Sequence, residues 1–204
     1  MAELCEKRGV FLISDEAYSD IVYDKEHFSL SSLKSDSIYS IITFSKTFSM
    51  TGWRLGAGIS RNEEFIEYLK KANYTQTAGV PPFIQYAGKE ALENMVMKEQ
   101  VNKNVNEFRK RRDLLYDGLS GIKGIEVIKP EGAFYMFPKL KGLEQNLRGH
   151  EKEEAIHNLL MENGIATVPG SCFGAYPGSY VRISFSATPI KMIKVGINRL
   201  NNLF

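Results

Sequence analysis

The chain has 204 residues, of which 43% are hydrophobic and 25% are charged, as is typical of a soluble globular protein with one large domain or two small ones. Its 26 basic and 24 acidic side chains leave a net charge of +2, too little to attract nucleic acid or an anionic membrane, and no apolar run reaches transmembrane length. The two cysteines, Cys5 and Cys172, form no disulfide framework and no metal-ligand spacing, so we expect a reducing cytoplasm and no metal site.

The predicted elements begin with the end of a helix, which stops at Gly9. Residues 10–14, "VFLIS", and residues 38–44, "IYSIITF", predict two buried strands, because both runs are rich in β-branched and aromatic residues. A loop around Lys46 then leads into "RLGAGIS", a third short strand. Because such a start resembles the middle of a domain, we expect that a further segment precedes it.

Helical spacing dominates the middle of the chain. Asn62 is expected to cap a helix over "NEEFIEYLKKANY". Residues 80–119, which open with two prolines, predict a long helical stretch that ends near Gly121 and could bridge two domains. We place the boundary inside this stretch, so that residues 1–100 form one domain and residues 101–204 the other.

The last third of the chain alternates short strands with helices. Residues 124–140, "GIEVIKPEGAFYMFPKL", predict a strand, a turn and a second strand. An amphipathic helix is expected over residues 149–164, and two more strand candidates, "IATVPGSCFG" and "YVRISFSAT", precede a closing helix over residues 189–204. Antiparallel strand pairs covered by helices indicate a small α+β domain.

Lys46 lies among small hydroxyl residues in "TFSKTFSMTGWRLG". Lysine is the side chain that supplies an amine for bonding to a carbonyl cofactor. Arg54, Thr43 and Ser45 flank Lys46 with a guanidinium and two hydroxyls, which are suitable donors for a phosphate. This loop is therefore a candidate site for a cofactor that carries both a carbonyl and a phosphate.

Asp15 directly follows the strand "VFLIS", and Tyr18 comes soon after it. If the cofactor contains a pyridine ring that accepts electrons, a carboxylate must keep the ring nitrogen protonated. Asp15 could do so from the carboxyl end of a strand, where ligands of α/β sheets bind, and Tyr18 could reach the phenolic oxygen of the ring. Taken alone, each of these residues would be read as part of a turn or of the surface; their joint order favours a cofactor site.

Five segments make a family resemblance specific: "SDEAYSDIVYD", "FSKTFSMTGWRLG", "EGAFYMFP", "VPGSCFG" and "YVRISFS". In order and spacing they resemble the C-terminal half of a class I/II aminotransferase, a fold-type I enzyme that depends on pyridoxal 5'-phosphate (PLP). The resemblance implies an α/β fold, with part of the PLP-binding large domain followed by a small α+β C-terminal domain. Family members are about twice as long, and the half that is missing here is the N-terminal one.

The resemblance also implies roles for individual residues. Lys46 matches the Schiff-base lysine, which shuttles the proton at the α-carbon of the substrate. Asp15 matches the partner of the pyridinium nitrogen, Tyr18 the hydroxyl on the ring oxygen, and Arg182 the arginine that binds the α-carboxylate in a bidentate pair. The implied activity is transfer of an amino group between an α-amino acid, with aspartate and aromatic donors both open, and a 2-oxo acid.

For the phosphate, the resemblance implies Thr43, Ser45 and Arg54. Family members complete this site from the neighbouring subunit of a homodimer, through a segment that matches "YTQTAGVPPFIQ". Here Ala78 stands where they often carry asparagine. Their glycine-rich phosphate loop and ring-stacking aromatic residue lie upstream of the part that this sequence matches.

Two other functions remain open. A PLP-dependent C–S β-lyase of the same fold would use the same residues, although "SMTGWRLG" fits aminotransferases better. An aminotransferase-like sensor domain of a transcription regulator would need basic DNA-reading elements upstream. The basic run "RKRR" at residues 109–112 lies on the long helix among acidic residues, which predicts a solvated helix face and no nucleic-acid site.

Overall fold

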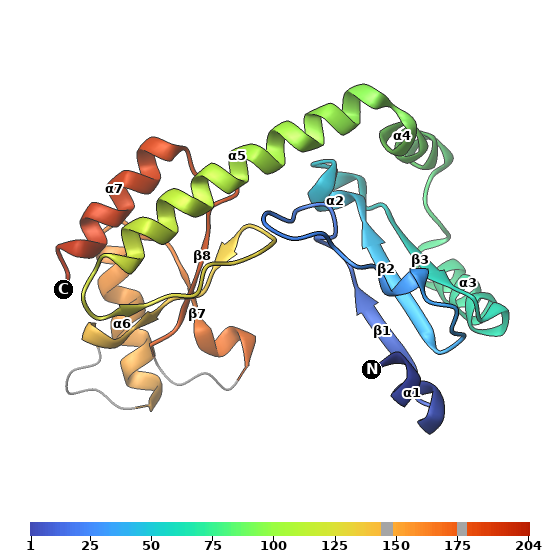
Figure 1. Cartoon of the computed structure of the whole chain (residues 1–204), viewed down its shortest axis with the longest axis horizontal. Coiled ribbons are helices and arrows are strands. Elements are labelled where there is room, and N and C mark those ends of the chain that lie inside the picture. The colour runs from blue at the N-terminus through green and yellow to red at the C-terminus, as the bar shows by residue number, and fades with distance from the viewer. Residues whose placement is uncertain (144–148, 175–178) are drawn as a thin grey trace. The chain divides into compact units, whose positions relative to one another are not determined.

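A computed structural model describes residues 1–143, 149–174 and 179–204. The chain divides into two compact units, Met1–Lys103 and Asn104–Phe204, and Figure 1 shows both with many of their helices and strands labelled. The mixture of helices and strands in the two units agrees with the expected α/β and α+β classes. No described helix is both long enough and apolar enough to cross a membrane. The predicted domain limits, residues 1–100 and 101–204, stay a prediction.

A three-stranded sheet forms the centre of the first unit (Figure 1). Its strands, in spatial order, are β1 (Leu12–Asp15), β2 (Ile38–Thr43) and β3 (Gly56–Ser60). β1 runs parallel to β2 with Asp15 opposite Ile41, and β3 runs antiparallel to β2 with Gly56 opposite Thr43. The carboxyl ends of β1 and β2 and the amino end of β3 therefore lie at the same edge of the sheet.

The first predicted strand is shorter and more exposed than its sequence suggests. Helix α1 (Ala2–Arg8) ends at Gly9, which has a left-handed φ of 62°, and the amide of Val10 donates to the carbonyl of Cys5 at 2.9 Å. Val10 is thus part of the helix terminus, and β1 begins at Leu12. The predicted burial is wrong for Ile13, which is 60% exposed; Ile41, on the same face of the sheet, is 37% exposed, so this face is open to solvent.

Two helices follow the sheet in the first unit. Helix α3 (Glu63–Thr77) begins as predicted at Asn62, whose side-chain oxygen accepts from the amide of Phe65 at 2.8 Å. Helix α4 (Pro82–Glu93) is separated from α5 (Met95–Ser120) by Asn94. The long predicted stretch is therefore two helices, because Asn94 has an extended backbone and its side chain caps the amide of Val96 at 2.9 Å.

Helix α4 packs against the loop that carries Lys46. Phe44, Met50 and Leu55 of this loop form a buried cluster with Ala91 of α4. Gly88 makes the close approach possible, because a Cβ atom at this position would lie 2.3 Å from Cδ2 of Leu55. The packing of α4 thus fixes both ends of the Lys46 loop.

The second unit contains short antiparallel strands and three helical segments. Its elements are the later part of α5, α6 (Gly149–Glu162), α7 (Ile190–Asn201), β4 (Ile125–Glu126), β5 (Tyr135–Met136), β6 (Lys139–Leu140), β7 (Val168–Pro169) and β8 (Val181–Ser184).

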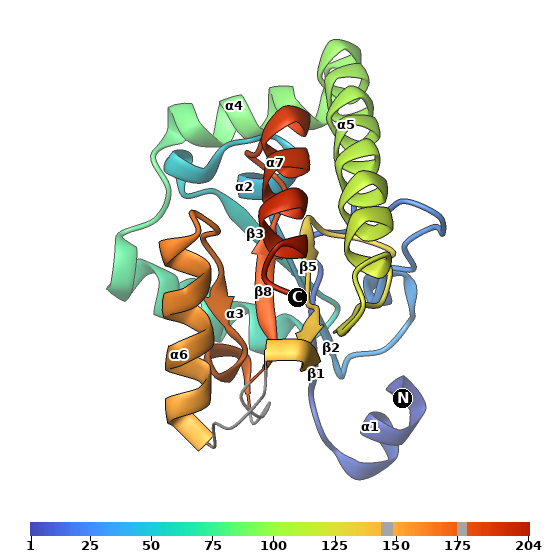
Figure 2. The ribbon, with the colours of Figure 1, turned by 90° about the vertical axis from the view of Figure 1, so that its left-hand side faces the viewer.

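Short helices lie at α2 (Phe44–Thr47), η1 (Leu30–Ser32) and η2 (Thr51–Trp53) in the first unit and at η3 (Lys141–Leu143) and η4 (Gly170–Phe173) in the second. In Figures 1 and 2, α5 and α7 lie side by side, and residues of both helices line a cavity with β8.

Strand pairing in the second unit differs from the predicted strand–turn–strand over residues 124–140. β4 pairs with β6, whereas β5 between them pairs with β8 in the order β5-β8-β7. The turn before β5 contains Ala133, which has a φ of 57°. The predicted small antiparallel α+β unit is confirmed, but its pairings connect segments that are distant in sequence.

The prediction of a solvated face for residues 109–112 is wrong for Arg112, which is 1% exposed. Its Nη2 atom lies 2.8 Å from Oδ1 of Asp113, and its Nη1 atom donates to the carbonyl of Pro130 at 3.1 Å. Arg111 is half-buried, with Nε 3.1 Å from Oε1 of Glu107. These arginines are structural, because this part of α5 packs on the segment that leads to β5.

Candidate active site

The predicted cofactor residues of the first unit lie where β1 and β2 end. Asp15 is the last residue of β1, Thr43 is the last residue of β2, and Arg54 directly precedes the segment that enters β3. Ser45 and Lys46 lie on α2, which follows β2 without a gap. Because the amide of residue 44 donates to the carbonyl of residue 55 at 3.1 Å, the loop between β2 and β3 closes on the same edge of the sheet.

Hydrogen bonds hold this loop from one end to the other. The Thr43 hydroxyl caps α2 by accepting from the amide of Ser45 at 3.2 Å. The Thr51 hydroxyl donates to the carbonyl of Ser45 at 3.1 Å, and Nη1 of Arg54 donates to the carbonyl of Thr51 at 2.9 Å. Arg54 is thereby folded back along the loop that carries Lys46.

Two residues of the loop have a backbone conformation that favours glycine. Ser49 and Arg54 both have a φ of 56°, and the left-handed conformation costs a non-glycine residue about 1 kcal/mol. It persists here because the buried side chains of Phe44, Met50 and Leu55 anchor the loop. Strain of this kind is concentrated at functional sites in proteins.

Three charged groups at this edge lack a partner of opposite charge among the residues that the structure describes. Within the described residues, no ion pair involves Lys46, Asp15 or Arg54, although Lys46 is half-buried. The carboxylate of Asp15 accepts from the amide of Ala17 at 3.1 Å. Charged side chains are seldom buried without a partner, so the half-buried amine of Lys46 is a candidate for bonding to a ligand, whereas Asp15 and Arg54 are exposed to solvent.

A buried carboxylate fastens the segment after β1, and no sequence pattern predicted it. Glu16 is 4% exposed and accepts from the hydroxyl of Ser40 at 2.8 Å and from the amide of Leu30 at 3.2 Å; Nε2 of His27 lies 3.1 Å from its second oxygen. Burial raises the pKa of Glu16, but side-chain hydrogen bonds from Ser29, Ser40, His27 and Ser14 outweigh it and lower this pKa to about 2. Glu16 thus fixes the residues that follow Asp15.

A second hydrogen bond joins the segment after β1 to α2. The hydroxyl of Thr47, the residue after Lys46, donates to Oδ2 of Asp20 at 3.0 Å. Tyr18 is half-buried and lies in the turn between Asp15 and Asp20, where its carbonyl accepts from the amide of Ile21 at 2.9 Å. The position of the Lys46 helix is therefore coupled to the segment that carries Asp15 and Tyr18.

Arg182 lies on β8, opposite Val168 of β7, in the second unit. Its guanidinium carbon is 4.5 Å from the centre of the Tyr135 ring and 4.3 Å from that of Phe173. No acidic side chain in the described ranges pairs with it. Aromatic contacts occupy the faces of a guanidinium and leave its N–H edges for hydrogen bonding, the arrangement that suits a bidentate carboxylate. Tyr135 and Phe173 lie in two of the family-like segments, but their contact with Arg182 was not predicted.

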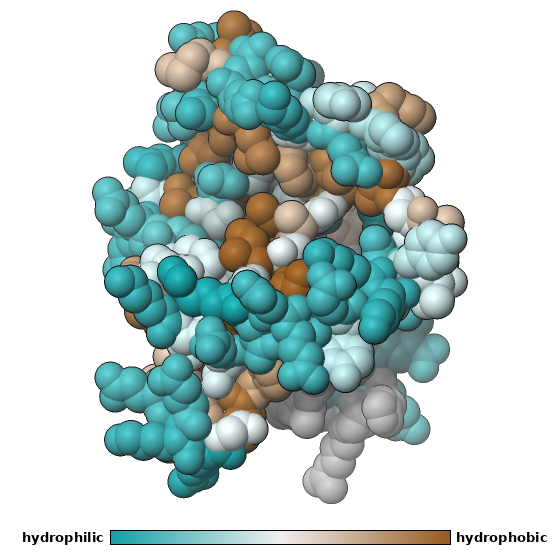
Figure 3. All heavy atoms as spheres, turned by 90° about the vertical axis from the view of Figure 1, so that its right-hand side faces the viewer, coloured by the Kyte–Doolittle hydropathy of each residue, from teal (hydrophilic) through white to brown (hydrophobic). Residues whose placement is uncertain are grey.

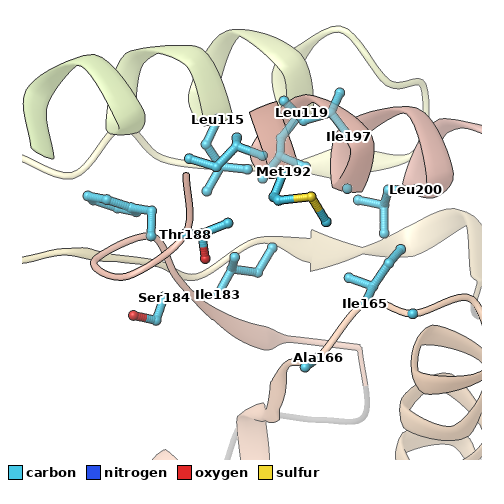
Figure 4. A pocket seen from close by; sticks show the side chains of 14 residues that line it. Leu115, Leu119, Ile165, Ala166, Ile183, Ser184, Thr188, Met192, Ile197 and Leu200 are labelled. Carbon is cyan, nitrogen blue, oxygen red and sulfur yellow. The ribbon is translucent and has the colours of Figure 1, made fainter. Parts of the chain in front are cut away.

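The second unit also has an apolar cavity of about 220 Å³. Figure 4 shows that leucine and isoleucine side chains from α5 and α7 point into it, with Ile183 and Ser184 on the side of β8. None of the predicted site residues lines this cavity, which is therefore separate from the Arg182 site.

Comparisons with known proteins give one consistent family. The model for "Aminotransferase class I and II" matches residues 1–200. A "Probable aspartate/prephenate aminotransferase" of Aquifex aeolicus is 38% identical over 205 residues, which cover 98% of this chain and 50% of that protein. The chain thus spans about half the length of the curated relatives it matches.

Solved structures agree with this result. The structure of aspartate aminotransferase from Thermus thermophilus with maleate superposes with a TM-score of 0.89 at 29% identity, and covers 100% of this chain and 50% of that one. The structure of an aromatic aminotransferase from Pyrococcus horikoshii gives a TM-score of 0.88 at 32% identity, with coverages of 99% and 53%.

Proposed function

The chain belongs to the class I and II aminotransferases, and on that premise we propose that it carries the catalytic residues of a PLP-dependent transaminase. This enzyme would move an amino group between an α-amino acid and a 2-oxo acid. The observation that best supports the proposal is the convergence of Asp15, Lys46 and Arg54, all without ion-pair partners in the described part of the chain, at one edge of the sheet.

The donor set at this edge fits PLP. When bound, PLP supplies a carbonyl carbon for the amino group and a ring that withdraws electrons. Thr43, Ser45 and Arg54 would bind its phosphate through two hydroxyls and a guanidinium. Asp15 would accept a hydrogen bond from the protonated ring nitrogen, and Tyr18 would donate one to the ring oxygen.

Lys46 would perform two tasks. Its amine would bond covalently to the cofactor before the substrate arrives. In the reaction itself, Nζ would take the proton from the α-carbon of the substrate as a general base. It would later give this proton back as a general acid. The hydrogen bond from Thr47 to Asp20 holds the helix on which this amine is carried.

Arg182 would bind the α-carboxylate of the substrate and fix the direction of its Cα–H bond. The relatives are named for aspartate, prephenate and aromatic substrates. An α-carboxylate and an α-amino or α-oxo group are what such substrates share. We therefore propose the class of reaction, with the preferred side chain left to experiment.

A homodimer is the proposed assembly. Figure 3 views the molecule from the side of α3 and α4 and shows patches of hydrophobic side chains, in brown, open to solvent among hydrophilic ones. The most exposed hydrophobic side chains of α4 and of the start of α5 are Phe83 at 70%, Tyr86 at 72%, Met95 at 67% and Val96 at 69%. Exposed apolar groups in such number are typical of a protein interface.

We also infer a cytoplasmic location and no partnership with nucleic acid or a membrane. Cys5 and Cys172 are both free thiols, which is usual in a reducing compartment. The net charge of +2 gives no electrostatic reason for nucleic-acid binding.

The decisive experiment is covalent mapping of the cofactor. The chain is incubated with PLP, reduced with borohydride, digested and analysed by mass spectrometry. We expect the phosphopyridoxyl mass on the peptide that contains Lys46 and no such mass in Lys46→Ala. Label spread over surface lysines, with none on Lys46, would contradict the proposal.

Product analysis then separates transamination from β-lyase chemistry, because only a lyase releases pyruvate and ammonia from cysteine.

A further inference from the structure

The guanidinium of Arg182 contacts aromatic rings and pairs with no acidic group in the part of the chain that the structure describes. Tyr135 and Phe173 lie 4.5 and 4.3 Å from its central carbon. These two rings form no ring pair with each other among the described contacts, and each contacts the guanidinium separately. We call the three side chains Tyr135, Arg182 and Phe173 the arginine clamp.

The clamp is itself supported by further rings. Phe173 makes an edge contact with Phe137 at 6.0 Å, and Phe137 stacks on Tyr180 at 5.4 Å. Tyr135 is on β5, which pairs with β8 and thus with the strand of Arg182. One ring of the clamp is therefore fixed by the sheet and the other by an aromatic chain.

Arginine has a long side chain with many rotamers, and ordering it on binding costs about 1–2 kcal/mol. Rings that flank the guanidinium reduce this cost, because they restrict its plane before a ligand arrives. They also cover the parts of the group that cannot donate hydrogen bonds, whereas an acidic partner would occupy the N–H donors that a carboxylate ligand requires.

We propose that Phe173 and Tyr135 are positioning residues, which hold the Arg182 guanidinium plane ready for the carboxylate of the substrate. This proposal rests on the role of Arg182 in the proposed function. Phe173 is the informative member because it is 41% exposed. A side chain so exposed contributes little to the core, so its replacement tests the clamp without unfolding the unit.

The test compares Phe173→Leu with Phe173→Tyr, which keeps an aromatic face. Phe204→Leu is the control, because Phe204 has a similar exposure of 40% and makes no contact with Arg182 among the described ring contacts. The readout is the NMR signal of the Arg182 side chain in the full chain, titrated with maleate as the carboxylate probe. In the unligated protein, ring currents should shift the Arg182 Hδ signals upfield, and Phe173→Leu should remove a large part of that shift.

We expect the dissociation constant for maleate to rise about tenfold in Phe173→Leu and to stay near the wild-type value in Phe173→Tyr and Phe204→Leu. In the Arg182→Lys background, Phe173→Leu should raise the dissociation constant for maleate by less than about twofold, because the ammonium group of lysine has no plane for a ring to orient.

Equal dissociation constants in wild type and Phe173→Leu would overturn the proposal. The same tenfold rise on Phe173→Leu in the Arg182→Lys background would overturn it too. An Arg182 signal that does not respond to maleate in the wild-type chain would also overturn it. Covalent labelling of Lys46 on the same samples reports separately on the proposed function, so the two failures are distinguishable.

Discussion

Lys46 and Arg182 are both held without an acidic partner among the described residues, but by different means. The loop of Lys46 is fixed through its backbone: a capped α2, two residues with a φ of 56°, and a buried apolar cluster. Arg182 lies on a regular strand and is fixed through its side chain, by two aromatic rings. The difference teaches that the amine depends on the conformation of a whole loop, whereas the guanidinium depends on a few neighbouring groups.

The largest expected effect tests the chemical side of this comparison. Replacing Lys46 with alanine should lower the proposed transaminase turnover by a factor of about 10³ or more, because the covalent bond and the proton carrier are both lost. Lys98→Ala is the matched control, since Lys98 is an exposed lysine without a proposed role. Substantial residual turnover in Lys46→Ala would count strongly against the assignment.

The next effect concerns the segment that carries Asp15 and Tyr18. Folding lowers the pKa of Glu16 from 4.5 to about 2, which corresponds to about 3 kcal/mol. This stabilisation is fully present above pH 4.5 and is lost as the pH falls through the folded value, since only the ionised form is favoured by the fold. The free energy of unfolding of wild type and of Glu16→Gln should therefore differ by about 3 kcal/mol at pH 7 and converge toward pH 2.

Denaturant titrations at several pH values measure this difference. A gap between wild type and Glu16→Gln that stays constant from pH 7 to pH 2 would show that the carboxylate of Glu16 contributes no charge-dependent stability.

A smaller effect tests whether α4 fixes the Lys46 loop. A methyl group at Gly88 would lie 2.3 Å from Cδ2 of Leu55 and 3.3 Å from Cε1 of Phe44, so Gly88→Ala should displace the loop and cost about 1–3 kcal/mol. Labelling of Lys46 by PLP should weaken, while the ring-shifted Arg182 signal serves as an internal reference. Gly196→Ala is the control, because nothing lies within 4 Å of a Cβ there. Unchanged labelling in Gly88→Ala would mean that the loop does not depend on α4.

The smallest effect concerns the backbone of the loop. Ser49→Gly should raise the free energy of unfolding by up to about 1 kcal/mol, because glycine adopts a φ of 56° without steric cost. Ala78→Gly is a matched comparison outside the loop, with a φ of 55° at the end of α3. If only Ala78→Gly is stabilised, the Ser49 conformation is held by local contacts that outweigh its strain.

The strand ends and the residues near them were predictable from sequence, whereas the supports of the site were not. Asp15 and Lys46 follow short runs of β-branched and aromatic residues, and the cap at Asn62 is a local signal. Glu16 could not be assigned in this way, because its partners Ser40 and His27 lie on segments that only the folded chain brings to it.

The same reasoning explains two other results in the second unit. The sequence predicts Arg112 to be a solvated charge, because it lies in a basic run. In the fold it is buried, because it packs against the segment of Pro130. Tyr135 and Phe173 were quoted within family-like segments, but a contact with Arg182 depends on how three strands pair. Interactions between residues a few positions apart can be predicted from the sequence, whereas contacts between strands of a sheet cannot.

The arginine clamp has a consequence for the heat of ligand binding. Because two rings already contact the guanidinium of Arg182, little apolar surface remains to be withdrawn from water when a carboxylate binds. A small change in heat capacity and a favourable enthalpy are then expected from calorimetry, since burial of apolar area is what makes the heat-capacity change large and negative. The water that a mobile arginine would release on binding has, at this position, been displaced during folding.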